Sequence, residues 1–349
     1  ARVIDPKAEI ETSGAFTIND GLIEKRDGGI EGKVIDCKGM CLAPGIIDIG
    51  VKICEPGEKH KESFRSASNA AAAGGVTSLV TRPDTKPSID TPELLEFFKN
   101  RGKAVSEVRI FPTASLTKKN NGKKMTEIGF LHDGGAVAFT DGFNSIPDTK
   151  IFHQILKYAS DFNTLIIGHP QDHFLTKNTS ATNGVFASIK GISSGPDTAE
   201  KIGMERDTAL VSNLNIRYHA DQITTKIGLD VLRKAKLTNN RITAGTSIHH
   251  LLFNELDIGN YKTFFKLKPP LRSNSDREAL TEAIREGLID NICSMHTPQD
   301  EESKRLPFEE AAPGAVGLET ILSASLSLYH NKLLSLNELF RLLAFNPAN

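Results

Sequence analysis

The sequence predicts an α/β protein whose main part is a (β/α)8 barrel. Short apolar stretches alternate with helical patterns from Gly45 onward, which is typical of βα units with parallel strands. We count eight strand candidates in this region, the number that closes such a barrel. The chain has 349 residues, 39% of them hydrophobic and 24% charged, which is enough to bury a large core.

Residues 1–43 predict a small β domain, and 44–349 are assigned to the barrel. The runs FTINDGLIEKRDGG (16–29) and KVIDCKGMCLAPG (33–45) are short and extended. Asp-Gly, Gly-Gly and Lys-Gly turns interrupt them, as expected for hairpins.

The first barrel strand follows a Pro-Gly turn and alternates in character. Its apolar side chains at 47, 49, 51 and 53 are expected on one face, whereas Asp48, Gly50, Lys52 and Cys54 are expected to face the barrel centre. All the strand candidates are Gly45–Ile53, Val76–Thr81, Val108–Thr113, Ala136–Thr140, Thr164–Gly168, Asn215–Ala220, Arg241–Gly245 and Asn291–Met295.

Helical patterns with recognisable ends separate these strands. Thr91 predicts an N-cap followed by Pro92 at the first helical position, and Gly74-Gly75 predicts a C-cap. The stretch 178–197, rich in Ser, Thr, Asn and Gly, predicts a long loop. The helix candidates are Ser63–Ala73, Thr91–Asn100, Asp148–Ser160, Ala199–Ser212, Thr225–Ala235, Ser275–Glu286, Leu318–Leu328 and Leu336–Ala344.

Charge and cysteine content argue against several classes of protein. A net charge of -1 offers no field that would attract nucleic acid or an anionic membrane, so neither is expected as a partner. No apolar run approaches the ~20 residues of a membrane span, and no signal-peptide layout is present at the N-terminus. The four cysteines, Cys37, Cys41, Cys54 and Cys293, form no C-x-x-C pair, so a reduced, cytoplasmic protein is expected.

Several framework motifs resemble those of dihydroorotases, members of the metal-dependent amidohydrolase superfamily that act in pyrimidine biosynthesis. The resemblance spans about Arg2 to Ala348 and implies a TIM barrel of the metal-dependent hydrolase type. It also implies that the small β domain is completed by a C-terminal segment beyond Asn349. The motifs include Leu42-Ala43-Pro44-Gly45, Glu55-Pro56-Gly57, Thr85-Lys86-Pro87, Pro269-Pro270-Leu271-Arg272 and Gly317-Leu318-Glu319-Thr320.

The same resemblance assigns roles to positions at the barrel mouth, and most of those positions carry other residues here. The family's first strand reads Asp-x-His-x-His-x-Arg, with two zinc-binding histidines and an arginine that holds the substrate carboxylate. These three positions are Gly50, Lys52 and Cys54.

The remaining positions are changed in the same way. Two substrate-contacting asparagines, the ligand histidine after the sixth strand, the catalytic aspartate and the last substrate-contacting histidine are replaced, in that order, by Asp84, Lys268, Gln222, Met295 and Gln299. Only Asp141 and His169 are retained as possible metal ligands, and His219 matches the first histidine after the sixth strand.

Two ligands are too few for zinc, which takes about three or four from the protein. A Lys52 ammonium ~4 Å from a divalent ion would be repelled by about 8 kcal/mol at an effective dielectric near 20. Met295 cannot transfer a proton. We therefore expect no metal, no cofactor and no catalytic residue.

Structural roles are the expected alternative for the polar residues that remain. His169 would then form local hydrogen bonds, and Asp48 would accept backbone N–H groups. Cys54 and Cys293 are expected to be buried, inert thiols. The remaining histidines, His219, His249, His250 and His296, are expected to pack or to support neighbours.

Charge suggests what fills the vacated mouth. Lys52, Lys268, Asp84 and Asp141 should converge there, and buried charges must be paired. We expect lysine–aspartate pairs, with Lys52 within about 6 Å of a carboxylate.

The resemblance offers a precedent for such a chain: an inactive dihydroorotase-like protein that assembles with aspartate transcarbamoylase. We therefore expect a structural partner of that enzyme, a homo-oligomer, or both. One alternative is an active or weakly active cyclic-amide hydrolase with zinc held through Asp141 and His169. Another is a small-anion binding module in which Lys52 and Lys268 form a cationic floor.

Overall fold

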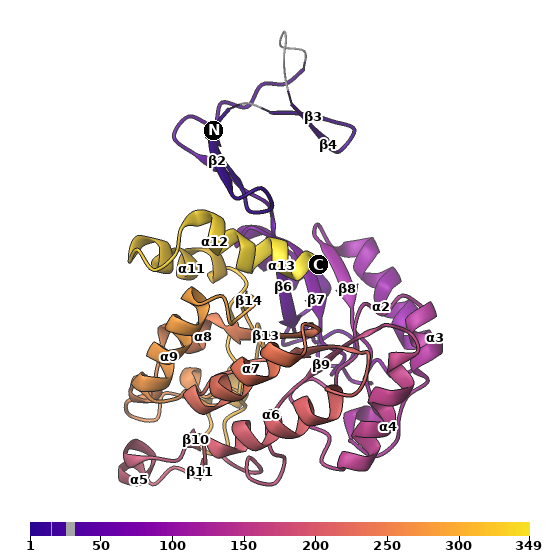
Figure 1. Cartoon of the computed structure of the whole chain (residues 1–349), viewed down its shortest axis with the longest axis vertical. Helices are drawn as coiled ribbons and strands as arrows, with labels where there is room; N and C mark the ends of the chain where they lie inside the picture. Colours follow the sequence, from indigo (N-terminus) through magenta and orange to yellow (C-terminus); the bar gives the residue numbers. More distant parts are fainter. Residues whose placement is uncertain (15, 26–31) are drawn as a thin grey trace.

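Parallel strands form the centre of the molecule and helices surround them (Figure 1). The structure is a computed structural model that describes residues 1–14, 16–25 and 32–349. One run of strands pairs in the order β6 (Ile46–Val51), β7 (Val76–Thr81), β8 (Arg109–Pro112). The other pairs in the order β9 (Leu165–Gly168), β12 (Arg217–Ala220), β13 (Ile242–Ser247), β14 (Asn291–Cys293).

The two runs are joined at two seams, which complete the barrel. At one seam Phe139 makes isolated parallel bridges to Ala114 and Ile166, so the strand expected at Ala136–Thr140 is reduced to its central residues. At the other seam the Ser294 backbone N–H donates to Asp48 Oδ1 over 2.8 Å. The Lys52 N–H also donates to the His296 carbonyl oxygen over 2.9 Å, so one side-chain and one backbone hydrogen bond join the strands where the barrel closes.

The predicted alternation along the first strand is broken at Gly50. The pairing of β6 with β7 shifts register between Ile49 and Val51, and Gly50 has φ of +87°. Ile49, expected on the outer face, therefore lines a small internal space together with Gly50.

Helices cover the outside of the barrel close to the predicted positions. Thr91 caps α2 as expected, since its side chain accepts from the Leu94 N–H. The helices that the sequence predicted are α1 (Phe64–Ala73), α2 (Pro92–Val105), α4 (Thr149–Ser160), α6 (Thr198–Val211), α7 (Lys226–Thr238), α9 (Asn274–Arg285), α11 (Ile321–His330) and α12 (Leu336–Phe340).

Two helix boundaries were wrong for physical reasons. Helix α2 continues past Asn100 to Val105, and Gly102 is buried within it against Phe64 and Ile110. Helix α11 begins after Leu318 because the backbone N–H groups of Gly317 and Leu318 turn inward to His296.

Several short elements were not predicted. The stretch expected as a loop at 178–197 contains the strand pair β10 (Ala181–Thr182) and β11 (Ser194–Gly195) around helix α5 (Val185–Lys190). The others are α3 (Ile128–Asp133), α8 (Ile248–Leu252), α10 (Glu301–Arg305), α13 (Asn346–Ala348), the 3-10 turns η1 (Lys118–Asn120), η2 (Glu255–Ile258) and η3 (Thr263–Phe265), and the π-helical turn η4 (Arg341–Phe345).

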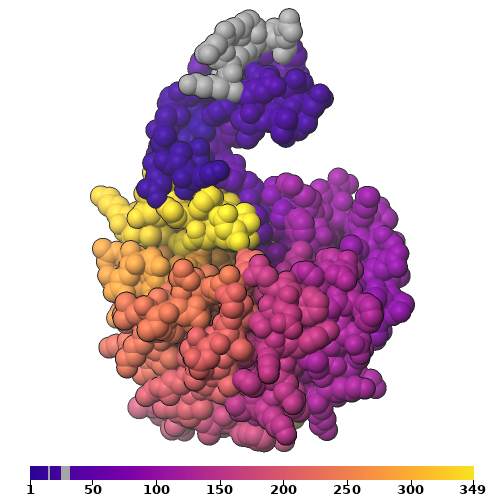
Figure 2. Space-filling view, turned by 45° about the vertical axis from the view of Figure 1, so that its right-hand side comes forward, coloured from indigo at the N-terminus to yellow at the C-terminus, as the bar shows by residue number. Residues whose placement is uncertain are grey.

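A small β unit projects from the end of the barrel that carries α12 (Figure 2). Strand β1 (Arg2–Asp5) pairs with β2 (Ile10–Ser13) and β5 (Cys41–Leu42), and β3 (Phe16–Asn19) forms a hairpin with β4 (Leu22–Lys25). Ile4 packs on Leu336 and Phe340 and so joins the unit to the barrel. The turn expected at 28–29 lies outside the described residues.

The core lies between the barrel and its helices. Phe64 and Phe98 meet edge to face at 4.6 Å, and Tyr218 is fully buried with its hydroxyl donating to Asp207. Within the described part of the chain, no helix has the length and apolar character needed to cross a membrane.

Candidate functional site

The residues that the resemblance places at an active site, except His219, meet at one end of the barrel. Most of them lie at or after the carboxyl end of a strand, and in barrels of this kind those ends form the mouth where reactions occur. The side chains there fall into three groups: a thioether packed against a glycine, a cluster of charges, and a set of isolated polar groups.

Met295 occupies the space that a side chain at position 50 would need. A Cβ atom built on Gly50 would stand 2.9 Å from Met295 Sδ, closer than real contacts allow. Gly50 also has φ of +87°, a left-handed conformation that L side chains rarely adopt. At the position of the first zinc ligand, the backbone conformation therefore disfavours any side chain, and a side chain there would displace the flexible end of Met295.

Lys52 forms an ion pair with Asp84, as the sequence predicted. Its ammonium lies 3.1 Å from Asp84 Oδ2, well inside the expected 6 Å. Arg82 holds the same carboxylate in a two-pronged contact, with Nε 3.0 Å from Oδ1 and Nη2 3.0 Å from Oδ2. Burial by itself would raise the pKa of Asp84, but the charges of Arg82 and Lys52 hold it well below its usual range.

Arg82 is the residue that the sequence analysis missed. It is only 3% exposed, and its guanidinium lies 3.9 Å from the centre of the Phe143 ring and donates to Thr297 Oγ1 over 3.3 Å. It follows β7 directly, at the end of a predicted barrel strand, and that position was the available signal.

Asp141 does not pair with a lysine, so that part of the pairing hypothesis was wrong. Its Oδ1 accepts the Thr117 backbone N–H over 2.9 Å, and its Oδ2 accepts the Thr117 hydroxyl. Burial raises the pKa of Asp141 and the hydrogen bonds from Thr117 lower it, and the net result is a pKa of about 6. Both of its oxygens accept hydrogen bonds from Thr117 in the loop after β8, which is not an arrangement that holds a metal.

His169 lies at the mouth without the local hydrogen bond expected for it. The ring is 6% exposed, packs against Phe143, and its Nδ1 has no hydrogen-bond partner in the described part of the chain. Burial, together with the nearby positive charges of Lys268, Arg82 and Arg272, lowers the pKa of His169 to about 3. The imidazole is therefore neutral near pH 7.

The remaining substituted positions are bound into the structure or buried. Gln222 is buried, and its Nε2 has no partner among the described residues. Gln299 donates to the Pro313 carbonyl oxygen over 2.9 Å. Burial raises the pKa of the Cys54 thiol to about 11, so this cysteine stays protonated at neutral pH.

Two histidines near these positions serve the scaffold. His296 Nδ1 accepts the Gly317 N–H over 3.2 Å, so its Nε2 carries the proton and donates to Glu62 Oε2 over 2.8 Å. His219 lies towards the opposite end of the barrel, where its Nδ1 is 2.8 Å from Thr243 Oγ1. Neither histidine joins Asp141 and His169.

The donor set at the mouth does not fit a zinc ion. Across residues 1–14, 16–25 and 32–349, no three His, Cys, Asp or Glu side chains lie together in a way that could hold a metal. Asp141 is engaged by Thr117, and the Lys52 ammonium stands among the former ligand positions. We derive no chemical step through a metal here.

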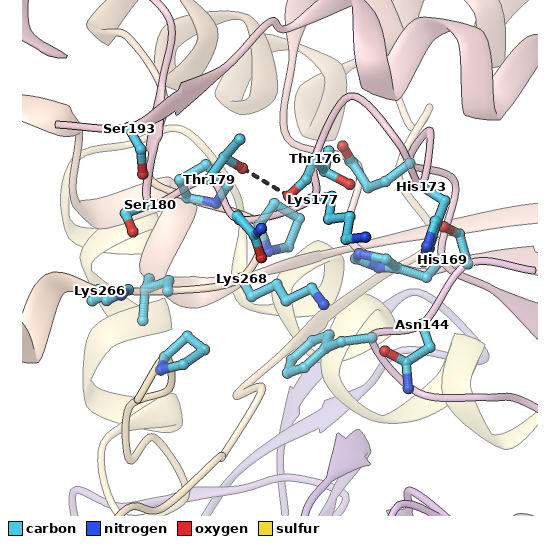
Figure 3. A pocket seen from close by; sticks show the side chains of 18 of the residues that line it. Asn144, His169, His173, Thr176, Lys177, Thr179, Ser180, Ser193, Lys266 and Lys268 are labelled. Atoms are coloured by element: carbon cyan, nitrogen blue, oxygen red, sulfur yellow. Dashed lines mark hydrogen bonds between the residues drawn. The ribbon is translucent and has the colours of Figure 1, made fainter. Parts of the chain in front are cut away.

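A cavity of about 710 Å³ opens beside these residues (Figure 3). His169 and Lys268 line it, together with Lys177 and His173 from the loop after β9. Lys52 is not part of this lining and is paired with Asp84, so the expected cationic floor of Lys52 and Lys268 was wrong. Nothing in the sequence around Lys177 indicated its place here.

Comparisons with known proteins agree with the fold and the framework motifs. A profile of the family described as "Dihydro-orotase-like" matches residues 39–228. The dihydroorotase of Ehrlichia canis (strain Jake) is 36% identical over 358 residues, covering 100% of this chain and 80% of that protein. A "dihydroorotase-like protein" of Pseudomonas aeruginosa is 33% identical over 352 residues, covering 100% and 83%.

A solved structure confirms the predicted barrel type. The L-hydantoinase (dihydropyrimidinase) from Arthrobacter aurescens superposes with a TM-score of 0.86 at 23% identity. The match covers 99% of this chain and 80% of that one. At this level of identity the likeness concerns the fold, and function has to be argued from the site.

Proposed function

This chain belongs to the dihydroorotase family, and we propose that it is a metal-free, catalytically inactive member that acts as a structural partner of aspartate transcarbamoylase. The family's place in pyrimidine biosynthesis sets the context for the proposal. What has to be argued is the loss of catalysis and the structural role.

The contact between Met295 and Gly50 is the observation that carries the proposed inactivity. Hydrolysis of a cyclic amide in this family needs a metal-activated water and a group that moves its proton. Met295 stands at the position of the proton-transferring aspartate, and its thioether fills the space of the first zinc ligand. One side chain thus removes both requirements.

The ion cluster supports the same proposal. Asp84 stands where the family has a substrate-binding asparagine, and it is held by Lys52 and Arg82. A carboxylate substrate would meet the Asp84 charge, while the guanidinium suited to holding that substrate is already engaged. These charged side chains at the mouth therefore pair with one another.

A structural role is supported by what the chain keeps and what it exposes. The barrel core is intact, although the catalytic positions are not. On the projecting β unit, the β3–β4 hairpin exposes Ile18, Leu22 and Ile23 to about 70% each. Apolar side chains gathered in this way are typical of surfaces that further protein covers, here either a partner chain or the segment beyond Asn349 that the resemblance implies.

The decisive experiment is co-purification. The chain is co-expressed with aspartate transcarbamoylase from its own source, captured through a tag on one partner, and sized by light scattering. We expect a defined hetero-complex. A chain that forms only homo-oligomers under these conditions would contradict the proposed partner.

Metal analysis and a dihydroorotate assay on the same preparation test the inactivity. Without added metal, we expect less than about a tenth of a zinc ion per chain and no turnover above the buffer rate. Stoichiometric zinc accompanied by turnover would favour the alternative of an active cyclic-amide hydrolase.

A further inference from the structure

The cavity at the barrel mouth has an excess of positive charge. Lys177, Lys266 and Lys268 line it, and the one acidic residue in the lining is Glu309. Glu309 is already satisfied: its oxygens accept the Ser193 N–H over 2.6 Å and the Ser180 hydroxyl over 2.7 Å. It therefore holds the β10–β11 region and is not free to accept a lysine.

The three lysines are not equivalent. Lys266 donates to the Glu309 backbone oxygen over 2.7 Å and lies near the Phe308 ring, so its ammonium is engaged. Lys177 and Lys268 have no carboxylate within 4.0 Å among the described residues. Two ammonium groups at one cavity without a counter-charge repel one another, and an anion between them would relieve that repulsion.

Lys177 and Lys268 are both exposed residues at the rim of this cavity. Partial loss of surrounding water and the nearby Arg82 guanidinium lower the pKa of Lys268, whereas the Asp84 carboxylate raises it. Asp84 is committed to Lys52 and Arg82, so it makes no ion pair with Lys268 in the described structure.

His169 and Gln171 belong to the cavity lining and are themselves only 6% and 3% exposed. His169 Nδ1 and Gln171 Oε1 are buried behind the cavity wall and have no hydrogen-bond partner among the described residues. Figure 3 shows His169 on the side of the cavity where Lys177 and Lys268 end.

We propose that this cavity binds a small phosphomonoester, with Lys177 and Lys268 holding the phosphate. Two lysines match the dianionic charge of a phosphate, and lysine binds phosphate as a point charge. The site goes beyond the proposed structural role and does not depend on it.

The rest of the ligand is expected to be polar and hydroxylated. A cavity of about 710 Å³ is much larger than inorganic phosphate and lies within the usual range of small-molecule sites. Its wall offers hydroxyl and amide groups. The polar wall consists of Asn144, Ser145, Thr176, Asn178, Thr179 and Ser180.

This site overlaps only in part with the one that the family resemblance assigns to a substrate carboxylate. Of the assigned positions, Lys268 lines the cavity, whereas Cys54, Asp84 and Gln299 do not. Arg82, whose planar guanidinium suits a carboxylate, is taken by Asp84. The phosphate would lie instead between the loop after β9 and the segment before Pro269.

Calorimetric titration of the purified full chain tests the proposal. The probes are inorganic phosphate, glycerol 3-phosphate and glucose 6-phosphate, with malate, glycerol and glucose as matched compounds. We expect the two phosphomonoesters to bind more tightly than phosphate or malate, and the uncharged compounds not to bind. Affinity should fall as salt is raised, because exposed charges contribute to the site.

Variants connect the binding to the named residues. Lys177→Met and Lys268→Met are each expected to weaken the better phosphomonoester by about tenfold or more, since each removes a charge-assisted hydrogen bond. Lys157→Met, on the exposed face of α4, is the matched control and should change affinity less than about twofold. Lys268→Gln provides a second, polar variant if Lys268→Met does not fold.

Two results would overturn the proposal. One is the absence of measurable binding to either phosphomonoester at about 10 mM in low salt. The other is binding that survives the loss of both lysines, or binding that is equally tight for malate. Either result leaves the proposed assembly with aspartate transcarbamoylase untouched, because that assembly does not require this cavity.

Discussion

The Lys52 ammonium and the Asp84 carboxylate are 3.1 Å apart, where the resemblance places a zinc ligand and a substrate-binding amide. The two substitutions are intelligible only together. Lys52 alone would leave a partly buried cation at the mouth, and Asp84 alone would leave Arg82 as its single partner. Where the resemblance places a metal and an anionic substrate, this chain has a carboxylate that is paired with its own cations.

Restoring the family's amide at position 84 is expected to destabilise the chain. Asp84→Asn removes the carboxylate shared by Lys52 and Arg82 and leaves two cations facing each other. We expect a loss of roughly 2–4 kcal/mol in the free energy of unfolding, measured by urea denaturation, because breaking a buried pair costs more than an exposed one.

Asp230→Asn is the matched control for this change. Asp230 pairs with Arg233 on the surface, with side chains 57% and 47% exposed, so its loss should cost at most about 1 kcal/mol. If Asp84→Asn costs no more than Asp230→Asn, the ion cluster at the mouth does not stabilise the fold.

A histidine reintroduced at position 50 is expected to conflict with Met295. Gly50→His meets the thioether at 2.9 Å and requires a side chain at φ of +87°. Overpacking and backbone strain predict a loss of roughly 2–5 kcal/mol in thermal or urea unfolding.

A double-mutant cycle with Met295→Ala separates the two causes. The Ala variant opens space, so the double variant should recover about 1–2 kcal/mol relative to the sum of the single changes. Strict additivity would show that Met295 does not exclude a side chain at position 50, and the argument for a closed ligand position would fail.

The sequence was sufficient for the framework because strand periodicity and turn residues are local signals. The expected bounds of β7 are those observed, and Thr91 caps the helix that it was expected to cap. The end of α2 was expected at Asn100 but lies at Val105, where Gly102 packs on Phe64 and Ile110. Such packing contacts are not visible in the local sequence.

The site was predictable as a set of positions but not as a set of contacts. That Lys52 should find a carboxylate followed from charge, and Asp84 provides it. That Asp141 would be held by Thr117 did not follow, because a hydroxyl gives no charge signal in the sequence. The packing of Met295 on Gly50 depends on a register shift that no alternation pattern reveals.

Added zinc is expected to leave the stability of the chain unchanged. A ligand that binds the folded state raises the melting temperature, and a site at 100 times its Kd would add about 2.7 kcal/mol. With Gly50 and Lys52 at the former ligand positions, we expect a shift below about 1 °C at micromolar zinc, measured by scanning calorimetry. His169→Phe is the control: a zinc-dependent rise that this variant abolishes would reveal a metal site there.

Asp141 makes a prediction about pH. Its pKa is about 6 in the folded chain because of burial, against an ordinary value of 3.8, so the folded state binds the proton more tightly than the unfolded state. The stability that this group contributes is full below about pH 4 and is lost as the pH rises through 6. Between pH 4.5 and pH 7.5 the loss attributable to Asp141 should be about 2 kcal/mol.

Asp141→Asn tests this by removing the titration while keeping the shape. The amide can still accept the Thr117 N–H and can donate to the Thr117 hydroxyl. In urea unfolding, the difference in stability between variant and parent should therefore move in favour of the variant by about 2 kcal/mol from pH 4.5 to pH 7.5. Asp230→Asn, at an exposed site, should show almost no such change over the same range. A difference for Asp141→Asn that is constant with pH, or that moves in favour of the parent, would mean that this carboxyl is not protonated more readily in the folded chain.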